Sequence, residues 1–111
     1  MMPADEPVQD GLKLIADLDR TVHSPARLMI LAILSVVDSA DFTFLMTQSG
    51  LTKGNLSSHL NVLEENGYIR VEKEFVEKIP RTLVRLTKAG RAAVIAYARD
   101  MSLVVEHFNQ L

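Results

Sequence analysis

The chain has 111 residues, 48% apolar and 23% charged, a composition that suits one small domain and excludes bulk disorder. It contains no cysteine, which excludes a disulfide framework and a thiolate metal site. The start, MMPADEPVQDG, lacks the basic and apolar regions of a signal peptide, and no apolar run could span a membrane. We therefore expect a soluble, cytoplasmic protein.

The formal net charge is −2, but the charges are unevenly distributed along the chain. Residues 1–20 carry five acids against two bases, whereas residues 66–91 carry seven bases against three acids. This distribution predicts a moderate basic patch on a mildly acidic body. Many solvated strands share the pattern, so charge alone is weak support for a nucleic-acid surface.

The first third of the chain predicts a tail and two helices. Residues 1–9 are expected to form a flexible N-terminal tail, and residues 11–22 a helix. That helix is indicated by apolar residues at helical spacing: Leu12, Ile15, Leu18 and Val22. Ser24 suits an N-cap and Pro25 the first helical position. The nearly all-apolar run 26–37 is then a central buried helix.

The next segment predicts a loop and a short helix. Residues 38–41 read as a loop, and residues 42–43 as a possible stub of strand. Thr43 could cap a helix over residues 44–49, which Gly50 would terminate.

Residues 51–70, LTKGNLSSHLNVLEENGYIR, predict a fourth helix that enters a hairpin. Thr52 is a suitable N-cap, and Gly67 can take a positive φ after the helix. The helix would bury one stripe of leucines: Leu56, Leu60 and Leu63. Alternation over residues 68–76 and 82–86 predicts two strands, with residues 77–81 as the turn between them.

Thr87 is expected to cap a long last helix that extends to Leu111. The tight turn at residues 49–51 joins two helices into a helix-turn-helix, and the following hairpin forms a wing. The predicted fold class is α+β, mostly helical: a winged helix-turn-helix with an added long C-terminal dimerisation helix. We assign residues 10–88 to the winged-helix domain and residues 89–111 to the dimerisation helix, packed with helix 11–22.

The polar residues of the fourth helix read as a recognition face. At about 100° per residue, they lie away from the leucine stripe or on its flanks. They are Thr52, Lys53, Gly54, Asn55, Ser57, Ser58, His59 and Asn61. Short hydroxyl and amide side chains at a helix N-terminus suit phosphates and base edges. Glu64 and Glu65 lie at the far end, away from a bound duplex.

The polar residues of this helix also allow two other interpretations, a catalytic site and a solvated surface. Ser57, Ser58 and His59 are adjacent, so on a helix they point in different directions, and no carboxylate lies beside the histidine to orient it as a base. A merely solvated helix surface is the second alternative. The wing that follows lowers the weight of this second alternative, and without a carboxylate pair or a nucleophile with a spaced base we expect no enzyme activity.

Three stretches resemble the winged-helix regulators of bacteria and archaea, most closely the small stand-alone family related to MarR and ArsR regulators. They are HSPARLMILAIL, DFTFLMTQSGLTKGNLSSHLNVLEENGYIRVEKEF and PRTLVRLTKAGRAAV. The resemblance covers roughly residues 20–97. It implies a homodimer whose fourth helix enters the DNA major groove while the wing reaches the backbone or minor groove. It places Lys73, Lys78 and Arg81 on the wing.

The chain departs from the family pattern in two places. Its wing tip lacks the usual glycine and arginine richness and carries Glu72, Glu74 and Glu77, so we expect modest affinity with a clear salt dependence. The last helix lacks the ligand spacing of the metal-sensing branch, so we expect no metal site and no cofactor. We read His107 as exposed or interfacial, and Arg27 as a residue that pins helices.

The last helix predicts a partner. Its heptad-like apolar stripe would outreach the body of the protein and, with the first helix, form a homodimer interface. The predicted interface residues are Leu12, Ile15, Tyr97, Met101, Val104, Phe108 and Leu111. The alternative is that this helix folds back on the first helix within one chain.

The leading hypothesis is a sequence-specific regulator, expected to be a repressor, that binds double-stranded DNA as a homodimer. The alternative is a winged-helix module for protein–protein contact without sequence-specific DNA binding. The sequence marks no small-molecule effector site and gives neither the operator nor the target genes.

Overall fold

The computed structural model describes the backbone of residues 5–111 and the side chains of residues 11–111. Its elements, in chain order, are α1 (Asp5–Ala16), α2 (Pro25–Ser35), β1 (Ala40–Asp41), α3 (Phe42–Ser49), α4 (Lys53–Glu65), β2 (Ile69–Val76), β3 (Ile79–Leu86) and α5 (Lys88–Asn109). This is the predicted winged helix-turn-helix with a long C-terminal helix.

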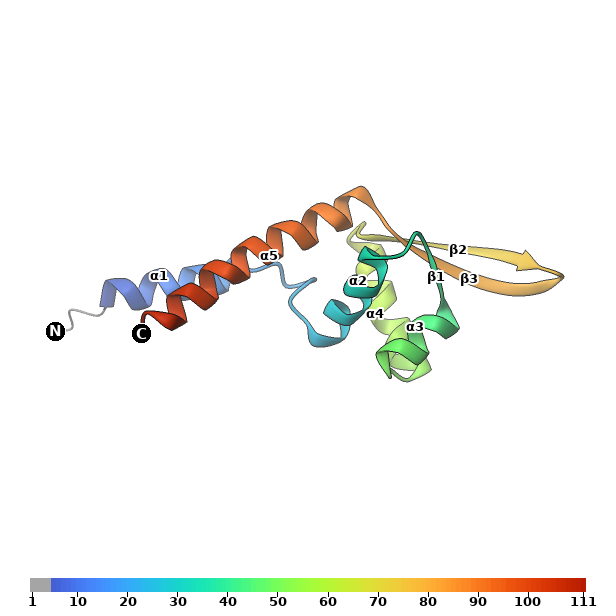
Figure 1. The fold of residues 1–111 in the computed structure, drawn as a ribbon, viewed down its shortest axis with the longest axis horizontal. Coiled ribbons are helices and arrows are strands. Elements are labelled where there is room, and N and C mark those ends of the chain that lie inside the picture. Colours follow the sequence, from blue (N-terminus) through green and yellow to red (C-terminus); the bar gives the residue numbers. More distant parts are fainter. Residues whose placement is uncertain (1–4) are drawn as a thin grey trace.

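The molecule has three parts along its longest axis (Figure 1). A body is formed by α2, α3, α4 and the base of a three-stranded antiparallel sheet with the order β1-β3-β2. On one side α1 and α5 lie antiparallel and form an arm, which brings the start of α1 near the end of α5. On the other side the β2–β3 hairpin projects as the wing. The overall extents are 69 × 26 × 22 Å.

The first helix differs from its prediction at both ends. It begins at Asp5, so residues 5–9, expected in a flexible tail, are helical; residues 1–4 lie outside the described part. It ends at Ala16 because the Asp19 carboxylate accepts hydrogen bonds from the backbone N–H groups of Thr21 and Val22, at 2.9 and 3.2 Å. An aspartate that bonds nearby backbone N–H groups favours a turn over a helix. Val22 is still fully buried, but from this turn.

The predicted N-cap of α2 is confirmed, because Ser24 Oγ accepts the N–H of Arg27 and Pro25 takes the first position. The start of α3 was misplaced. The strand stub is β1, two residues earlier than predicted, and α3 is capped by Asp41, whose Oδ1 accepts the N–H of Phe44 at 2.7 Å. Pairing of Ala40 with Val84 fixes the end of the strand and therefore the capping position. Gly50 ends α3 with φ 72°, as predicted.

The wing turn is shorter than predicted. It consists of Glu77 and Lys78 alone, with φ values of 53° and 68°, while residues 79–81 belong to β3. A two-residue turn with both φ values positive matches the twist of a hairpin, which explains the choice over a five-residue loop. Pro80 is tolerated because β1 pairs only with Leu83 and Val84, leaving that edge of β3 open at the proline.

One apolar cluster unites body and arm. Its largest fully buried side chains are Ile30, Leu31, Leu34, Leu45, Leu56, Leu63, Val22 and Val84. Tyr97 and Val104 of α5 also belong to it, at 9% and 5% exposure. The long helix is thus fixed to its own chain over its first four turns or so.

Candidate nucleic-acid interface

The helix α4 is held by its leucines and presents a polar face. Leu56, Leu60 and Leu63 are buried, as predicted. Thr52 caps the helix, because its Oγ1 accepts the N–H of Asn55 at 3.2 Å. Six of the predicted recognition residues are exposed: Thr52, Lys53, Gly54, Asn55, Ser58 and Asn61. These residues therefore form one open surface at the start of the helix, which we call the recognition face.

Two predicted recognition residues lie at the edge of this face. Ser57 and His59 are half-buried. The Nδ1 atom of His59 lies 3.0 Å from Nη1 of Arg27, whose Nε and Nη2 donate to the carbonyl oxygens of Thr21 and Arg20. Arg27 therefore pins the α1–α2 segment to α4, as predicted. His59 faces a cation and not a carboxylate, an arrangement that does not prepare it as a catalytic base.

The electrostatics of α4 favour an anion at its start. The first turn contains Lys53 and no acidic residue. The free backbone N–H groups of a helix N-terminus carry a partial positive charge. Glu64 and Glu65 are in the last turn, at the opposite end of the helix from Lys53, so their negative charges do not oppose an anion at the start of α4.

The wing distributes its charges over two faces. Partners across an antiparallel pair share a face, and alternate residues change face. Lys73 is opposite Thr82, on the face that continues from the half-buried Val71 and the buried Val84. Arg81 is opposite Glu74, on the other face. Of the predicted wing residues, Lys73 and Arg81 thus lie on opposite faces, and Lys78 lies in the turn.

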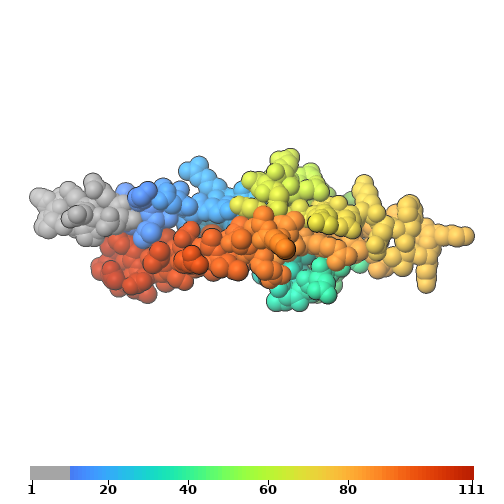
Figure 2. All heavy atoms as spheres, turned by 90° about the horizontal axis from the view of Figure 1, so that it is seen from above, coloured from blue at the N-terminus to red at the C-terminus, as the bar shows by residue number. Residues whose placement is uncertain are grey.

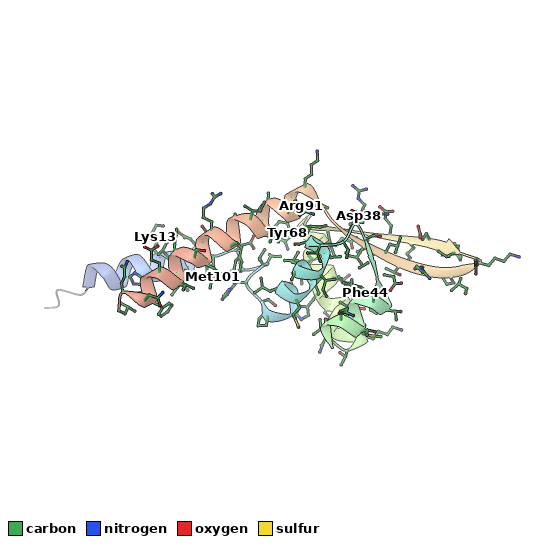
Figure 3. All side chains as sticks on the ribbon, viewed as in Figure 1. Lys13, Asp38, Phe44, Tyr68, Arg91 and Met101 are labelled. Atoms are coloured by element: carbon green, nitrogen blue, oxygen red, sulfur yellow. The ribbon has the colours of Figure 1, made fainter. Side chains whose placement is uncertain are left out.

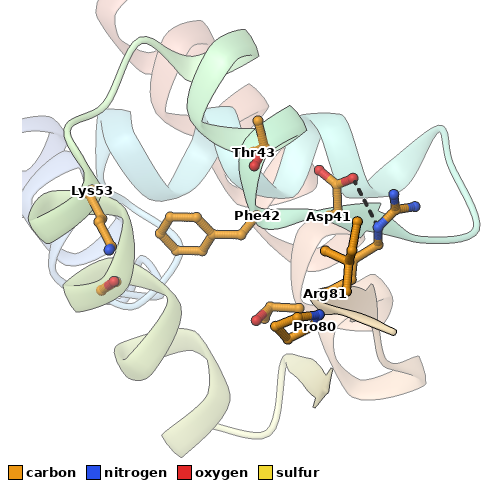
Figure 4. A pocket seen from close by; sticks show the side chains of 9 residues that line it. Asp41, Phe42, Thr43, Lys53, Pro80 and Arg81 are labelled. Atoms are coloured by element: carbon orange, nitrogen blue, oxygen red, sulfur yellow. Dashed lines mark ion pairs between the residues drawn. The ribbon is translucent and has the colours of Figure 1, made fainter. Parts of the chain in front are cut away.

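A hollow of about 570 Å³ separates the recognition face from the wing (Figure 4). Lys53 and Ser57 of α4 line one side, and Pro80, Arg81 and Thr82 of β3 line the other. Its floor is formed by the start of α3: Asp41, Phe42 and Thr43. The hollow follows the open edge of β3, and it joins predicted residues of helix and wing in one surface.

Sequence reasoning missed the part that Asp41 takes in this surface. Its Oδ2 lies 4.0 Å from Nε of Arg81, shown by the dashed line in Figure 4, while its Oδ1 caps α3. The carboxylate of Asp41, which belongs to the body, therefore attracts and orients the guanidinium of Arg81 on the wing. The sequence signal was the opposite charge of Asp41 and Arg81, but Asp41 had been predicted to lie in a loop, so the two residues were not expected to be neighbours. Thr43 and Thr82 were also missed as residues of this surface, since Thr43 was predicted only as a helix cap and Thr82 only as the start of a strand.

The arm separates the seven predicted dimer residues into two groups. Tyr97 and Val104 are buried against their own chain, so their direct place in a dimer interface is corrected; Met101 is half-buried. The physical reason is that α1 and the α1–α2 segment contact α5 within the chain, and packing of α5 on the first helix was the stated alternative. The remaining predicted residues are exposed at the far end of the arm: Leu12 (60%), Ile15 (41%), Phe108 (58%) and Leu111 (75%).

The arm and the body are joined by two tyrosines. Tyr68 donates its hydroxyl to Asp19 Oδ2 at 2.6 Å, and this bond, with burial and the carboxylate charge, raises the pKa of Tyr68. Burial raises the pKa of Tyr97, whose hydroxyl lies 2.7 Å from Nδ1 of His23. Figure 3 shows Tyr68 beneath the first turns of α5. His107 is half-buried against Gly11, where an added Cβ would collide with its ring.

In the described part of the chain, no helix is both long and apolar enough to cross a membrane. The family described as "Winged helix DNA-binding domain" matches residues 26–105, and the chain belongs to this family. The match covers both the recognition face and the wing. The predicted resemblance to winged helix-turn-helix regulators is therefore confirmed.

The chain is also similar to individual known proteins. An uncharacterized protein of Methanocaldococcus jannaschii is 35% identical over 79 residues, 71% of this chain and 86% of that protein. A transcriptional regulator homologue from Pyrococcus horikoshii OT3 is 28% identical with a TM-score of 0.76, covering 93% of this chain and 97% of that one. A MarR-family transcriptional regulator from Silicibacter pomeroyi shares the fold at 24% identity, TM-score 0.59, covering 96% and 69%.

Proposed function

We propose that this chain is a transcriptional regulator that binds double-stranded DNA in a sequence-specific manner as a homodimer. One observation carries the proposal: the exposed polar start of α4 and the basic wing border a single open hollow. The family, described by its winged-helix DNA-binding domain, and the regulators of like fold support the same class.

In this proposal the recognition face enters the major groove. Its side chains are short, so the helix can approach base edges closely, and Asn55 and Ser58 are the groups that would read them. Lys53 and the free N–H groups at the start of α4 would hold phosphates. The sugar–phosphate backbone beside that groove would then lie in the hollow, with Arg81 on its other side.

The arm supplies the proposed dimer contact. Four large apolar side chains are exposed at its far end, and they border an apolar hollow of about 130 Å³. Contact with a second copy would remove this surface from water. Two-fold symmetry would present two recognition faces to a pseudo-palindromic site. A dimer that lies across a promoter excludes the polymerase, so repression is the expected effect.

A protein-contact module is the second candidate, and one observation favours it. The wing tip exposes Phe75 and Ile79, at 76% and 64%, and aromatic and aliphatic side chains are typical anchors at protein interfaces. The recognition face lacks such anchors, because its exposed residues are short and polar.

The proposal is tested by selection from a random duplex library with the purified full chain at low and moderate salt. Enrichment of a two-fold symmetric motif supports a dimeric, sequence-reading regulator and yields the operator. Binding without enrichment would contradict sequence specificity. Absence of binding at low salt would contradict DNA binding itself and favour the protein-contact candidate.

Matched variants assign the roles within the recognition face. Lys53→Ala should lower the slope of log K against log salt by about 0.9, the value for one phosphate contact. Lys13→Ala is the control, since it removes the same charge from an exposed site on the arm. Asn55→Ala and Ser58→Ala should relax sequence preference, whereas Ser102→Ala on α5 should not. Equal losses on every sequence would contradict base reading.

A further inference from the structure

The wing tip exposes an apolar cluster that the proposed function leaves unexplained. Phe75 is 76% exposed, Ile79 64% and Val76 37%, and Pro80 beside them is exposed as well. Figure 2 shows this part of the hairpin projecting as a narrow strip beyond the body. Single exposed apolar residues are ordinary, but several at the tip of an unprotected hairpin invite aggregation unless they contact something. We call these four residues the tip cluster.

The two faces of the wing differ in charge. Phe75 is opposite Pro80, and this pair shares a face with Lys73 and Thr82 and, nearer the body, with the buried Val84. No carboxylate between residues 69 and 86 lies on that face. Lys73 is thus the charged neighbour of the Phe75–Pro80 pair, and the face suits a polyanion.

The acidic residues that seemed to dilute the wing charge lie on the opposite face or in the turn. Glu72 is 3.5 Å from Nη1 of Arg70, and Glu74 is the cross-strand partner of Arg81. Each therefore has an arginine near it on its own face. Glu77 is in the turn beside Lys78.

The tip cluster is continuous with the surface proposed to hold DNA. Pro80 and Thr82 line the hollow that contains Lys53, and the same two residues line a second hollow of about 290 Å³. The other residues that line this second hollow are Lys73, Phe75 and the cross-strand pair Glu74 and Arg81. A sugar–phosphate backbone in the first hollow therefore has the tip cluster on its far side, away from the groove that α4 occupies. The next groove on that side of the backbone is the minor groove.

We propose that Phe75 and Pro80 act as an apolar wedge, which enters the minor groove next to the recognition helix and partly unstacks one base step. Apolar side chains of this kind press between base steps in other minor-groove complexes. The basic residues Lys73, Lys78 and Arg81 hold the flanking phosphates. The wedge would favour flexible pyrimidine–purine steps, because these cost least to unstack. This inference rests on the proposed function and adds a specificity determinant outside the recognition face.

The test uses the full chain and duplexes of the selected sequence that carry 2-aminopurine at successive flanking positions, since its fluorescence rises on unstacking. At saturating wild-type protein, the fluorescence should rise at one symmetric position in each half-site. Phe75→Ser should abolish that rise and weaken binding about tenfold, as expected for loss of one good contact. Phe75→Leu should retain much of the fluorescence rise and of the affinity, because leucine is also a bulky apolar side chain.

Two controls separate the wedge from other effects. Val36→Ser removes an apolar residue that is 81% exposed at the end of α2, away from both hollows, and should change neither readout. Lys53→Ala should weaken binding yet leave the rise intact at saturating protein. Folding of each variant is checked by its thermal transition, which these exposed positions should not move.

Three results would overturn the wedge. One is a wild-type complex that shows no fluorescence rise at any flanking position. Another is a 2-aminopurine fluorescence rise that is as large with saturating Phe75→Ser as with the wild type. If the wild-type chain binds no duplex at low salt, the proposed function fails together with the wedge. Tight binding without unstacking overturns the wedge alone.

Discussion

The Nδ1 atom of His23 lies 2.7 Å from the hydroxyl oxygen of Tyr97, across 74 positions of the sequence. The two rings are tilted by 39° with their centroids 5.8 Å apart. This contact fixes the α1–α2 segment to α5. The same segment holds Tyr68 through Asp19 and α4 through Arg27. The segment between the first two helices therefore joins the arm to the recognition helix.

Replacement of Tyr97 by Phe should lower the free energy of unfolding by about 1 kcal/mol, the usual net value of one hydrogen bond. The phenylalanine ring would still fill the buried site, so the loss of free energy of unfolding measures the contribution of the hydroxyl group alone. Urea unfolding of Tyr97→Phe, His23→Ala and the double variant measures the coupling. Additive losses in this cycle would show that the two side chains do not stabilise one another.

The raised pKa values of Tyr68 and Tyr97 predict a loss of stability in alkali. The folded chain holds both hydroxyls protonated above their ordinary pKa of 10.0, so it binds more protons than the unfolded chain there. The contribution of these two hydroxyls to stability is therefore fully present below about pH 10 and is lost as the pH rises through their folded pKa values. Urea unfolding at about pH 8 and pH 11 should show a smaller fall for Tyr68→Phe than for the wild type. An equal fall would contradict the role of the Tyr68–Asp19 bond.

Two glycines should respond oppositely to alanine. An added Cβ at Gly90 would collide with the carbonyl oxygen of Tyr68, so Gly90→Ala should cost about 1–3 kcal/mol by overpacking. Gly54 has open space around it and is helical, so Gly54→Ala should add about 0.5–1 kcal/mol. Thermal unfolding checks both.

Gly54→Ala should nonetheless weaken duplex binding, because the methyl group would stand on the recognition face where α4 is proposed to approach the bases. Fluorescence anisotropy compares the duplex affinity of Gly54→Ala with that of the wild type. Ala26→Gly, a glycine–alanine exchange in α2 outside the recognition face, is the control. A Gly54→Ala chain that binds the operator as tightly as the wild type would show that no close approach occurs at this position.

The wing turn stores backbone strain that can be relieved. Glu77 and Lys78 both have positive φ, which is unfavourable for residues with a Cβ. Asn-Gly is the preferred pair for such a turn, so Glu77→Asn with Lys78→Gly should raise the free energy of unfolding by about 1 kcal/mol or more. Thermal unfolding is the measurement, and Lys73→Gly in the strand is the opposing control. An unchanged or lower transition would contradict the strained turn.

The arm should lose its partner when charge is placed at its far end. Phe108→Asp with Leu111→Asp should convert the proposed dimer into a monomer that retains its helical circular dichroism, because both residues are exposed in the single chain. Sedimentation equilibrium reports the mass, and Val36→Asp is the control. Val104→Asp is unsuitable, since that side chain is 5% exposed and its replacement would unfold the chain. A double variant that remains dimeric would move the interface elsewhere.

Local chemistry in the sequence was sufficient for most elements. Ser24, Thr52 and Thr87 were predicted as N-caps, and each accepts a backbone N–H of its helix. These predictions succeed because a cap and a leucine stripe act within one or two turns of the chain. The exposed start of α4 followed from the same periodicity, and with it most of the recognition face.

The predictions that failed depended on contacts between distant segments. The periodic Leu18 and Val22 suggested a helix, but Asp19 turns the chain there and holds Tyr68. Asp41 became the cap of α3 because its neighbour pairs with Val84. In the first case the same carboxylate that turns the chain also binds a residue 49 positions away, and in the second a strand partner 44 positions away sets the boundary.

The sequence by itself determined the winged-helix order, the buried leucines and the polar start of α4, because hydrophobic periodicity and capping are local properties. Only the tertiary structure decided how the last helix is used: Tyr97 and Val104 of α5 are buried against their own chain, where α1 and the α1–α2 segment contact this helix, and Phe108 and Leu111 remain in water. It also decided the two faces of the wing. The register of β2 on β3 places Lys73 beside Phe75 and Pro80 and sets the glutamates opposite them, since one residue of slip would exchange the faces.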